Sequence, residues 1–308
     1  MKYAWLIVAI LLVTIAVIWW RRPVLPQTQL RLLVLEEDGR PVVGAKTGAA
    51  FEILGGDNRA IRETYTGEDG LAVFTSKSTG SVSFGATKKG YYPSRWGYKF
   101  TSSLGGMWQP WNKEIRVVLR RVVNPVPMYA RSTQTINLSL PEKGKEIGFD
   151  LMECNWISPY GSGKRADFVF FQGSAADGTP VLRITFPNRW DGIQISRNEF
   201  PYSDFYFDRH APLAGYQPEL AIKYSKLIND DQNVGYYFRV RSSEDGGRLA
   251  RGMYGKIRGE IRFDINARGT ASIAMDYYLN PDYSTNLEFD PGRNLVVGAN
   301  SYELLTAP

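Results

Sequence analysis

The chain of 308 residues contains only one cysteine and one histidine. A single cysteine excludes an internal disulfide and any zinc site built from several cysteines. A single histidine excludes metal centres that need two or three histidines, including the His-Glu-x-x-His motif. The sequence also lacks a long basic run, a zinc-finger pattern and an RNA-binding signature, so we expect no nucleic-acid partner. These absences leave few familiar routes to catalysis.

The net charge of +6 is unevenly distributed along the chain. Residues 1–22 carry +3, residues 23–121 carry +5 and residues 122–308 carry −2. This distribution favours a weak attraction of the first part of the chain to an anionic surface. The length suggests two domains, and the hydrophobic content of 44% is enough to fill their cores.

Eighteen consecutive residues without a formal charge, Tyr3 to Trp20, form the clearest signal in the sequence. As a helix rising about 1.5 Å per residue they would span about 27 Å, close to the thickness of a bilayer core. Aromatic and basic residues mark the two expected membrane interfaces: Trp5, Trp19, Trp20, Arg21 and Arg22. We therefore predict a transmembrane signal anchor over residues 1–22, followed by a spacer over residues 23–29.

A cleaved signal peptide is the alternative interpretation of this segment. Its apolar core is usually about 7–15 residues long and precedes a small-x-small cleavage site. Here Ile18, Trp19 and Trp20 stand where small residues would be needed. Basic residues flank both ends, so the positive-inside rule leaves the orientation open. The large β-rich remainder favours a protein anchored in a bacterial inner membrane with its C-terminal domains in the periplasm.

Alternating apolar and polar residues recur in the next hundred positions, as in Val82–Ala86 and Ile115–Arg120. Such alternation places one face of a strand in a core and the other toward water. Turn-forming segments such as Glu36–Gly39 and Thr66–Gly70 separate the short apolar runs. Short strands with turn signals at this spacing indicate a β-sandwich.

Three motifs in this region resemble the carboxypeptidase regulatory-like domain: Asp38–Ala45 (DGRPVVGA), Thr66–Gly70 (TGEDG) and Lys88–Tyr92 (KKGYY). The resemblance covers about residues 29–121 and departs at Gly67, where that family usually has Asp or Asn. It implies an immunoglobulin- or transthyretin-like β-sandwich over residues 30–121 and no catalysis by the module itself. The zinc enzyme domain that accompanies such modules in metallocarboxypeptidases needs two histidines, which this chain lacks.

The segment 122–130 contains two prolines that interrupt the strand pattern, so we expect a linker there. Residues 131–308 then predict a larger β-sandwich of about nine to eleven strands, since no long segment has a helical period. Segments 159–164 and 277–282 resemble a region of uncharacterised bacterial envelope proteins. The clearest candidate strands are Thr135–Leu140, Ile147–Met152, Asp167–Phe171, Val181–Phe186, Ile193–Ile195, Leu220–Tyr224, Val234–Val240, Lys256–Ile265 and Ala271–Tyr278.

Six aromatic residues within 21 positions are interleaved with basic residues and are the candidate binding residues: Tyr91, Tyr92, Trp96, Tyr98, Trp108 and Trp111. Flat aromatic faces stack on sugars or pack against a protein partner. The alternative is that these side chains close the end of a small sandwich, because aromatics are as common in cores as at interfaces.

Oxygen-bearing side chains between residues 280 and 294 offer a possible calcium site, with Asp282, Glu288 and Asp290 as carboxylate ligands. The spacing is not that of an EF-hand, and Asp and Asn also form turns. We expect no other cofactor.

Acid–base and nucleophilic catalysis have a small number of candidate residues. Glu199, Asp204 and Asp208 lie among aromatics and could supply the paired carboxylates of a glycan hydrolase. Cys154 and His210 form the only Cys–His pair in the sequence, but the ordinary role of a cysteine in the setting of Cys154 is that of a small buried apolar residue. Segment 161–165 (GSGKR) does not fit a phosphate-binding loop and predicts a turn.

These observations favour an all-β, membrane-anchored, extracytoplasmic protein that is not an enzyme. Its expected work is binding or structural, through a partner protein or a glycan of the cell envelope. We expect the first domain to be a spacer or docking module and the second to carry most specific recognition. The alternative is a carboxylate-dependent glycan hydrolase in the second domain, which would require a cleft with converging acids.

Overall fold

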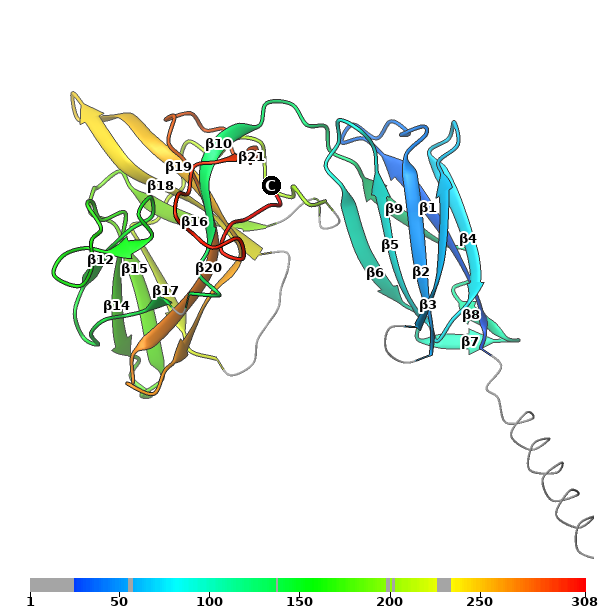
Figure 1. Cartoon of the computed structure of the whole chain (residues 1–308), viewed down its shortest axis with the longest axis horizontal. Helices are drawn as coiled ribbons and strands as arrows, with labels where there is room; N and C mark the ends of the chain where they lie inside the picture. Colours follow the sequence, from blue (N-terminus) through cyan, green and yellow to red (C-terminus); the bar gives the residue numbers. More distant parts are fainter. Residues whose placement is uncertain (1–24, 55–57, 137, 198–199, 201–202, 226–233) are drawn as a thin grey trace, which may run out of the picture. The chain divides into compact units, whose positions relative to one another are not determined.

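The computed structural model describes residues 25–54, 58–136, 138–197, 200, 203–225 and 234–308. Within these residues all regular structure is β-strand, which confirms the predicted all-β class (Figure 1). The chain divides into two compact units, Met1–Leu119 (unit 1) and Arg120–Pro308 (unit 2).

The predicted anchor over residues 1–22 lies outside the described residues, with its five marker residues Trp5, Trp19, Trp20, Arg21 and Arg22. Over the part of the chain that the structure does describe, no helix is long and apolar enough to cross a membrane.

Unit 1 is a sandwich of two sheets. One sheet has the order β4 (Leu71–Lys77), β1 (Gln27–Leu35), β8 (Met107–Gln109) and β7 (Ser102–Leu104), and β9 (Lys113–Val118) also pairs with β1, in parallel. The other sheet has the order β3 (Asn58–Tyr65), β2 (Lys46–Leu54), β5 (Ser81–Thr87) and β6 (Ser94–Lys99).

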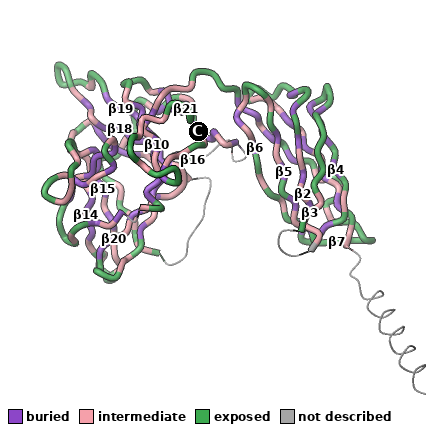
Figure 2. Tube along the Cα trace, in the orientation of Figure 1, coloured by how far each residue is buried: buried purple, intermediate pink, exposed green. Residues whose placement is uncertain are grey.

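The two-residue period of the strands builds the core of unit 1, and Figure 2 shows buried and exposed positions alternating along them. On β1, Leu30, Leu32 and Val34 are completely buried, and Phe51 of β2 is equally inaccessible. Each apolar side chain removed from water contributes about 1.5–3 kcal/mol to folding before the entropy cost. The β-sandwich predicted for residues 30–121 is therefore confirmed as a fold.

The two turn motifs of unit 1 are joined to each other. The hydroxyl of Thr66 donates to the carbonyl oxygen of Val42 at 2.5 Å and accepts from the amide of Ala45 at 2.9 Å. Gly70 has a φ of +74°, and a Cβ there would lie 2.6 Å from the Val34 carbonyl oxygen. This turn thus requires glycine for two reasons, its backbone conformation and its close approach to β1.

Unit 2 is a larger two-sheet structure. A seven-stranded sheet has the order β16 (Gly192–Arg197), β18 (Val234–Asp245), β19 (Arg248–Ile265), β20 (Ala271–Asn280), β10 (Val126–Ser132) and β21 (Phe289–Asn294), and β11 (Leu138–Ser139) pairs with β20. A five-stranded sheet has the order β13 (Asn155–Trp156), β12 (Ile147–Asp150), β14 (Phe168–Ser174), β15 (Pro180–Thr185) and β17 (Glu219–Lys223).

Aromatic side chains from both sheets fill the core of unit 2. The Phe168 ring meets Phe170 and Phe238 edge to face, with centroids 6.1 and 5.2 Å apart. These contacts join β14 to β18 and add to the stability gained from burial alone. The predicted β-rich second part is confirmed, with twelve strands in its described residues against the nine to eleven expected.

The linker expected over residues 122–130 is shorter in the structure. Strand β10 begins at Val126, and Met128 within it is fully buried. The amides of Val123 and Asn124 donate to the two carboxylate oxygens of Glu288 at 2.8 and 2.6 Å. Two prolines suggested a break, but β10 already lies within the sheet between β20 and β21, and the residues before it are held by the Glu288 side chain.

Candidate functional site

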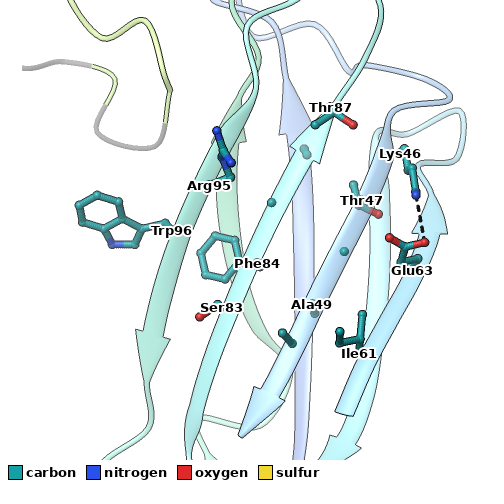
Figure 3. A pocket seen from close by; sticks show the side chains of 14 residues that line it. Lys46, Thr47, Ala49, Ile61, Glu63, Ser83, Phe84, Thr87, Arg95 and Trp96 are labelled. Carbon is teal, nitrogen blue, oxygen red and sulfur yellow. Dashed lines mark ion pairs between the residues drawn. The ribbon is translucent and has the colours of Figure 1, made fainter. Parts of the chain in front are cut away.

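A shallow concavity of about 450 Å³ lies on the four-stranded sheet of unit 1 and is lined by residues of β2, β3, β5 and β6 (Figure 3). Along β2 and β5, Ala49, Phe84 and Ala86 point into the core. Positions that alternate with them face outward and carry very small side chains: Gly48, Ala50, Ser83 and Gly85.

The strand register places these small residues side by side. Gly48 pairs with Gly85, and Ala50 pairs with Ser83, across the β2–β5 ladder. A Cβ at Gly85 would lie 3.1 Å from the Arg95 side chain on β6. The concavity exists because the paired outward positions of β2 and β5 carry only glycine, alanine and serine.

Larger side chains border the floor, as Figure 3 shows. On β3, Ile61 is 64% exposed, and Glu63 forms a 3.0 Å ion pair with Lys46 of β2. The Glu63 carboxylate raises the pKa of Lys46, so this lysine stays charged. On β6, at the other side, Arg95 faces outward, whereas Trp96 pairs with the core-facing Phe84 and its ring points away from the floor (Figure 3). The concavity has the apolar Ile61 and charged groups at its margins and a flat floor between them.

The six aromatic residues named from the sequence do not form one platform. Tyr92 is buried, and the Tyr91 hydroxyl donates to Glu36 at 2.6 Å, near the turn that follows β1. Trp108 lies beyond the opposite end of β5, where its indole N–H donates to the Ser78 carbonyl at 3.0 Å.

The remaining aromatics of that set serve different neighbours. The Tyr98 ring meets Phe100 edge to face at 4.8 Å and lies 5.4 Å from the Lys113 ammonium. Trp111 is half-buried after β8, and its amide donates to the Gln109 side chain. Of the six, Trp96 is the residue at the rim of the concavity, and its side chain lies on the face of β6 opposite to Arg95.

The carboxylates named for hydrolysis are not seen together. Asp208 is exposed, and its Oδ2 accepts a hydrogen bond of 3.0 Å from the Tyr237 hydroxyl. Asp204 is half-buried, and Glu199 lies outside the described residues.

The three carboxylates named for calcium are each engaged elsewhere. Glu288 is buried and accepts from Arg209 at 3.0 Å in addition to the two backbone amides of the linker. Asp290 pairs with Arg293 at 2.6 Å, and this hydrogen bond lowers the pKa of Asp290. Asp282 accepts from the Ser284 amide. Among the described residues no three acidic, cysteine or histidine side chains are grouped to hold a metal ion.

Cys154 and His210 have different surroundings. Cys154 is buried, and burial raises the pKa of its thiol, which disfavours the reactive thiolate. His210 is exposed, and its Nδ1 lies 3.2 Å from the Thr285 hydroxyl. Neither residue has the geometry of a nucleophile beside its base.

The segment 161–165 is a turn whose backbone donors are already used. The amides of Lys164 and Arg165 both donate to Oδ2 of Asp150 at 3.0 Å. A phosphate-binding loop would need such amides to face its ligand. In this chain the two amides donate to the Asp150 carboxylate instead of to a phosphate.

A buried charge network in unit 2 went unrecognised in the sequence. Arg241 donates to both carboxylate oxygens of Asp167, at 2.7 and 2.9 Å, and to Asp150 at 2.8 Å. Burial raises the pKa of Asp167 despite the arginine. Burial also opposes ionisation of Asp150, but hydrogen bonds from Arg165, Lys164 and other backbone amides leave its pKa lowered. Arg241 lies 74 residues from Asp167 and 91 residues from Asp150 along the chain, so no short sequence motif indicates that the three residues meet.

Lys256 is a second unexpected feature of unit 2. Its side chain is fully buried, and the ammonium nitrogen lies 2.9 Å from the Leu287 carbonyl oxygen. Its nitrogen also lies 4.5 Å from the ring centre of Phe205 and 4.7 Å from that of Tyr278. Burial, assisted by the charges of Arg258 and Arg120, lowers the pKa of Lys256 well below its usual value. Because the group is closed to solvent, it is part of the core rather than of a reaction site.

Comparison with known proteins adds no family. No family model matches the sequence, and no curated protein matches it. Among solved structures, a streptococcal ancillary pilin is 12% identical over 66% of this chain and 60% of its own, with a TM-score of 0.24. A mutant of the shaft pilin SpaA from Lactobacillus rhamnosus GG is 11% identical over 74% and 92%, with a TM-score of 0.25. A proposed carbohydrate-binding protein from Bacteroides uniformis is 10% identical over 83% and 99%, with a TM-score of 0.22. Similarities this low carry no argument about what this chain does.

Proposed function

We propose that this protein is a non-catalytic binding protein of the bacterial cell envelope, anchored in a membrane by residues 1–22 and exposing its two β units outside the cytoplasm. The open concavity on β3, β2, β5 and β6 is the observation that carries the proposal. Its paired charges, Lys46 and Glu63, bind each other, and its floor consists of backbone and small side chains. Such a surface suits recognition rather than acid–base chemistry.

A glycan of the envelope is the ligand that this surface favours. Sugar rings have apolar faces and polar edges, and the concavity has the exposed Ile61 together with Arg95 and the Lys46–Glu63 pair. Its flat floor leaves room for a ring to approach the strands closely. This proposal places recognition in unit 1, whereas the sequence had led us to expect most of it in the second domain.

Binding to purified peptidoglycan sacculi tests the proposal with the full chain held in lipid nanodiscs. Ile61→Asp puts a charge on the border of the concavity, and we expect it to weaken sedimentation with sacculi about tenfold or more, equivalent to about 1.4 kcal/mol. Val73→Asp is the matched control, because Val73 is also an exposed β-branched residue (47%) but lies on β4 of the other sheet. Equal binding by both variants would contradict the concavity as the site, and no binding to sacculi would contradict the glycan.

The anchor has its own test. We expect the full chain to stay in the membrane fraction after alkaline carbonate extraction, and a periplasm-dependent reporter fused after Pro308 to be active. A fully soluble chain would contradict the anchor, and a reporter active only in the cytoplasm would contradict the orientation.

The hydrolase alternative predicts a different outcome with the same material. Incubation with sacculi should then release soluble glycan fragments, and Asp204→Asn or Asp208→Asn should abolish the release. Since Asp208 is exposed and hydrogen-bonded to Tyr237, we expect no release from any form of the chain.

A further inference from the structure

A small β-hairpin projects from the end of unit 1 at which β1 begins (Figure 1). In it β7 pairs with β8, and the Leu104–Met107 pair flanks a two-residue turn of Gly105 and Gly106. Both glycines have positive φ, +58° and +76°, as a tight hairpin turn requires. Every residue from 101 to 107 is exposed, so the side chains of the hairpin tip are open to solvent.

The tip of this hairpin is apolar. Leu104 is 74% exposed and is the most exposed large hydrophobic side chain among the described residues of unit 1. Met107 beside it is 37% exposed. Two exposed apolar residues on a turn of two glycines contribute nothing to the core, so their burial requires another surface.

The base of the hairpin is fixed to the sandwich. The Trp108 indole N–H donates to Ser78, and its ring packs so closely on Gly80 that a Cβ there would lie 3.0 Å away. The amide of Gln27 donates to the Gly106 carbonyl at 2.8 Å. The apolar tip is therefore held beside the first residues of β1.

Charge differs between the two ends of unit 1. At the hairpin end the strand register gathers more basic than acidic side chains among the described residues: Arg59, Lys77, Lys99 and Lys113, with Glu52 and Glu114. The turns at the other end carry more acidic than basic residues: Glu36, Glu37, Asp38, Glu68 and Asp69, with Arg40, Lys88 and Lys89. The hairpin end is thus suited to an anionic surface.

The length of chain before β1 limits where this end can lie. The uncharged run ends at Trp20, seven residues before Gln27. Seven residues span at most about 25 Å even when fully extended. If the run crosses a bilayer, the hairpin end stays within that reach of the lipid headgroups.

We propose that the hairpin end of unit 1 docks on the phospholipid bilayer, with Leu104 and Met107 in the interfacial layer and the four basic side chains among the headgroups. This inference rests on the proposed membrane anchor. It adds a second membrane contact, which presents the concavity in a fixed relation to the membrane surface.

A spin label at the tip tests the docking in the full chain, reconstituted in nanodiscs of phosphatidylethanolamine and phosphatidylglycerol. Leu104→Cys receives the nitroxide, and Val43→Cys, 48% exposed at the opposite end of unit 1, is the control. The parent chain serves as the labelling blank, since Cys154 is buried. We expect the label at 104 to collide with lipid-dissolved oxygen at least about five times more often, relative to a water-soluble nickel complex, than the label at 43.

Equal, water-like collision rates at both positions in an integrated chain would overturn the docking and leave the anchor standing. Failure of the chain to integrate into nanodiscs would contradict the anchor and the docking together.

The charges have a separate test. We expect Lys77→Glu with Lys99→Glu to return the label at position 104 to water, because both lysines are exposed at the hairpin end. Lys88→Glu with Lys89→Glu, at the opposite end, should leave the label in lipid. An identical response of the two double variants would contradict an electrostatic contribution to docking.

Discussion

Unit 1 and unit 2 use their charges in different ways. In unit 1 the ion pairs lie at the surface, as in Lys46–Glu63, whose side chains are 50% and 57% exposed. Unit 2 has exposed pairs as well, such as Lys164–Glu153, but it also has enclosed ones such as Arg241–Asp167, with 12% and 0% exposure. The exposed charges of unit 1 can therefore meet a ligand or a membrane, whereas the enclosed charges of unit 2 hold distant parts of the chain together.

The energetic consequences of this difference are large. An exposed ion pair contributes about 0–1 kcal/mol because water and salt screen it. Removing one partner of a buried pair costs about 3–5 kcal/mol because the other charge is left without compensation. Substitutions of the same kind should thus have very different effects in the two units.

The largest effect is expected at the centre of the buried network. Arg241→Met removes the partner of both Asp167 and Asp150, and we expect it to lower the unfolding free energy of unit 2 by about 3–5 kcal/mol. Arg40→Met is the matched change in unit 1, where the arginine is 68% exposed, and should cost less than about 1 kcal/mol. Guanidinium denaturation followed by circular dichroism measures both, and equal losses would contradict the comparison.

A glycine pair gives the next largest contrast. A Cβ at Gly255 of β19 would overlap the Phe238 ring and the Tyr278 carbonyl oxygen, so Gly255→Ala should cost about 1–3 kcal/mol. A Cβ at Gly48 of β2 would meet no atom closer than 3.7 Å, and Gly48→Ala should leave stability unchanged or slightly raised. Thermal unfolding compares the two, and a larger loss for Gly48→Ala would show that unit 1 is packed more tightly than described.

Lys256 should have a smaller effect, which depends on pH, on the unfolding free energy of unit 2. The pKa of Lys256 is lowered in the folded state, so as pH falls from its unfolded value near 10.5 only the unfolded chain gains the proton. Unit 2 therefore loses stability as pH falls below about 10.5. Lys256→Met removes this cost, and we expect the variant to be more stable than the parent at pH 7. Urea denaturation at pH 7 and pH 10 should show the advantage shrinking at the higher pH; a constant or growing advantage would contradict it.

Sequence patterns predicted the parts of the fold that depend on local alternation. Strands β5 and β9 were recognised because one face of each is buried. Strand β3 was missed because it is an edge strand that is exposed on both faces. Its residues, which include Arg59, Arg62 and Glu63, show no alternation of apolar and polar side chains. In the same way β21 contains Asp, Pro and Gly and was interpreted as a calcium-binding segment.

The sites were less predictable than the fold for a physical reason. Clustering of aromatic residues along the sequence suggested one platform, but the hairpin strands carry Tyr91 and Trp108 to opposite ends of unit 1. The concavity depends instead on small residues that meet only through the register of β2 and β5. Glycine and alanine on an outer strand face give no chemical signal until that register is known.

Hydrogen–deuterium exchange of the full chain in nanodiscs, with and without sacculi, tests most directly whether recognition belongs to unit 1. Strand β3 is exposed at the edge of its sheet, so its amides should report a ligand in the concavity. We predict that sacculi slow exchange in residues 58–65 and leave the described strands of unit 2 unchanged. Slower exchange confined to unit 2 would contradict the account.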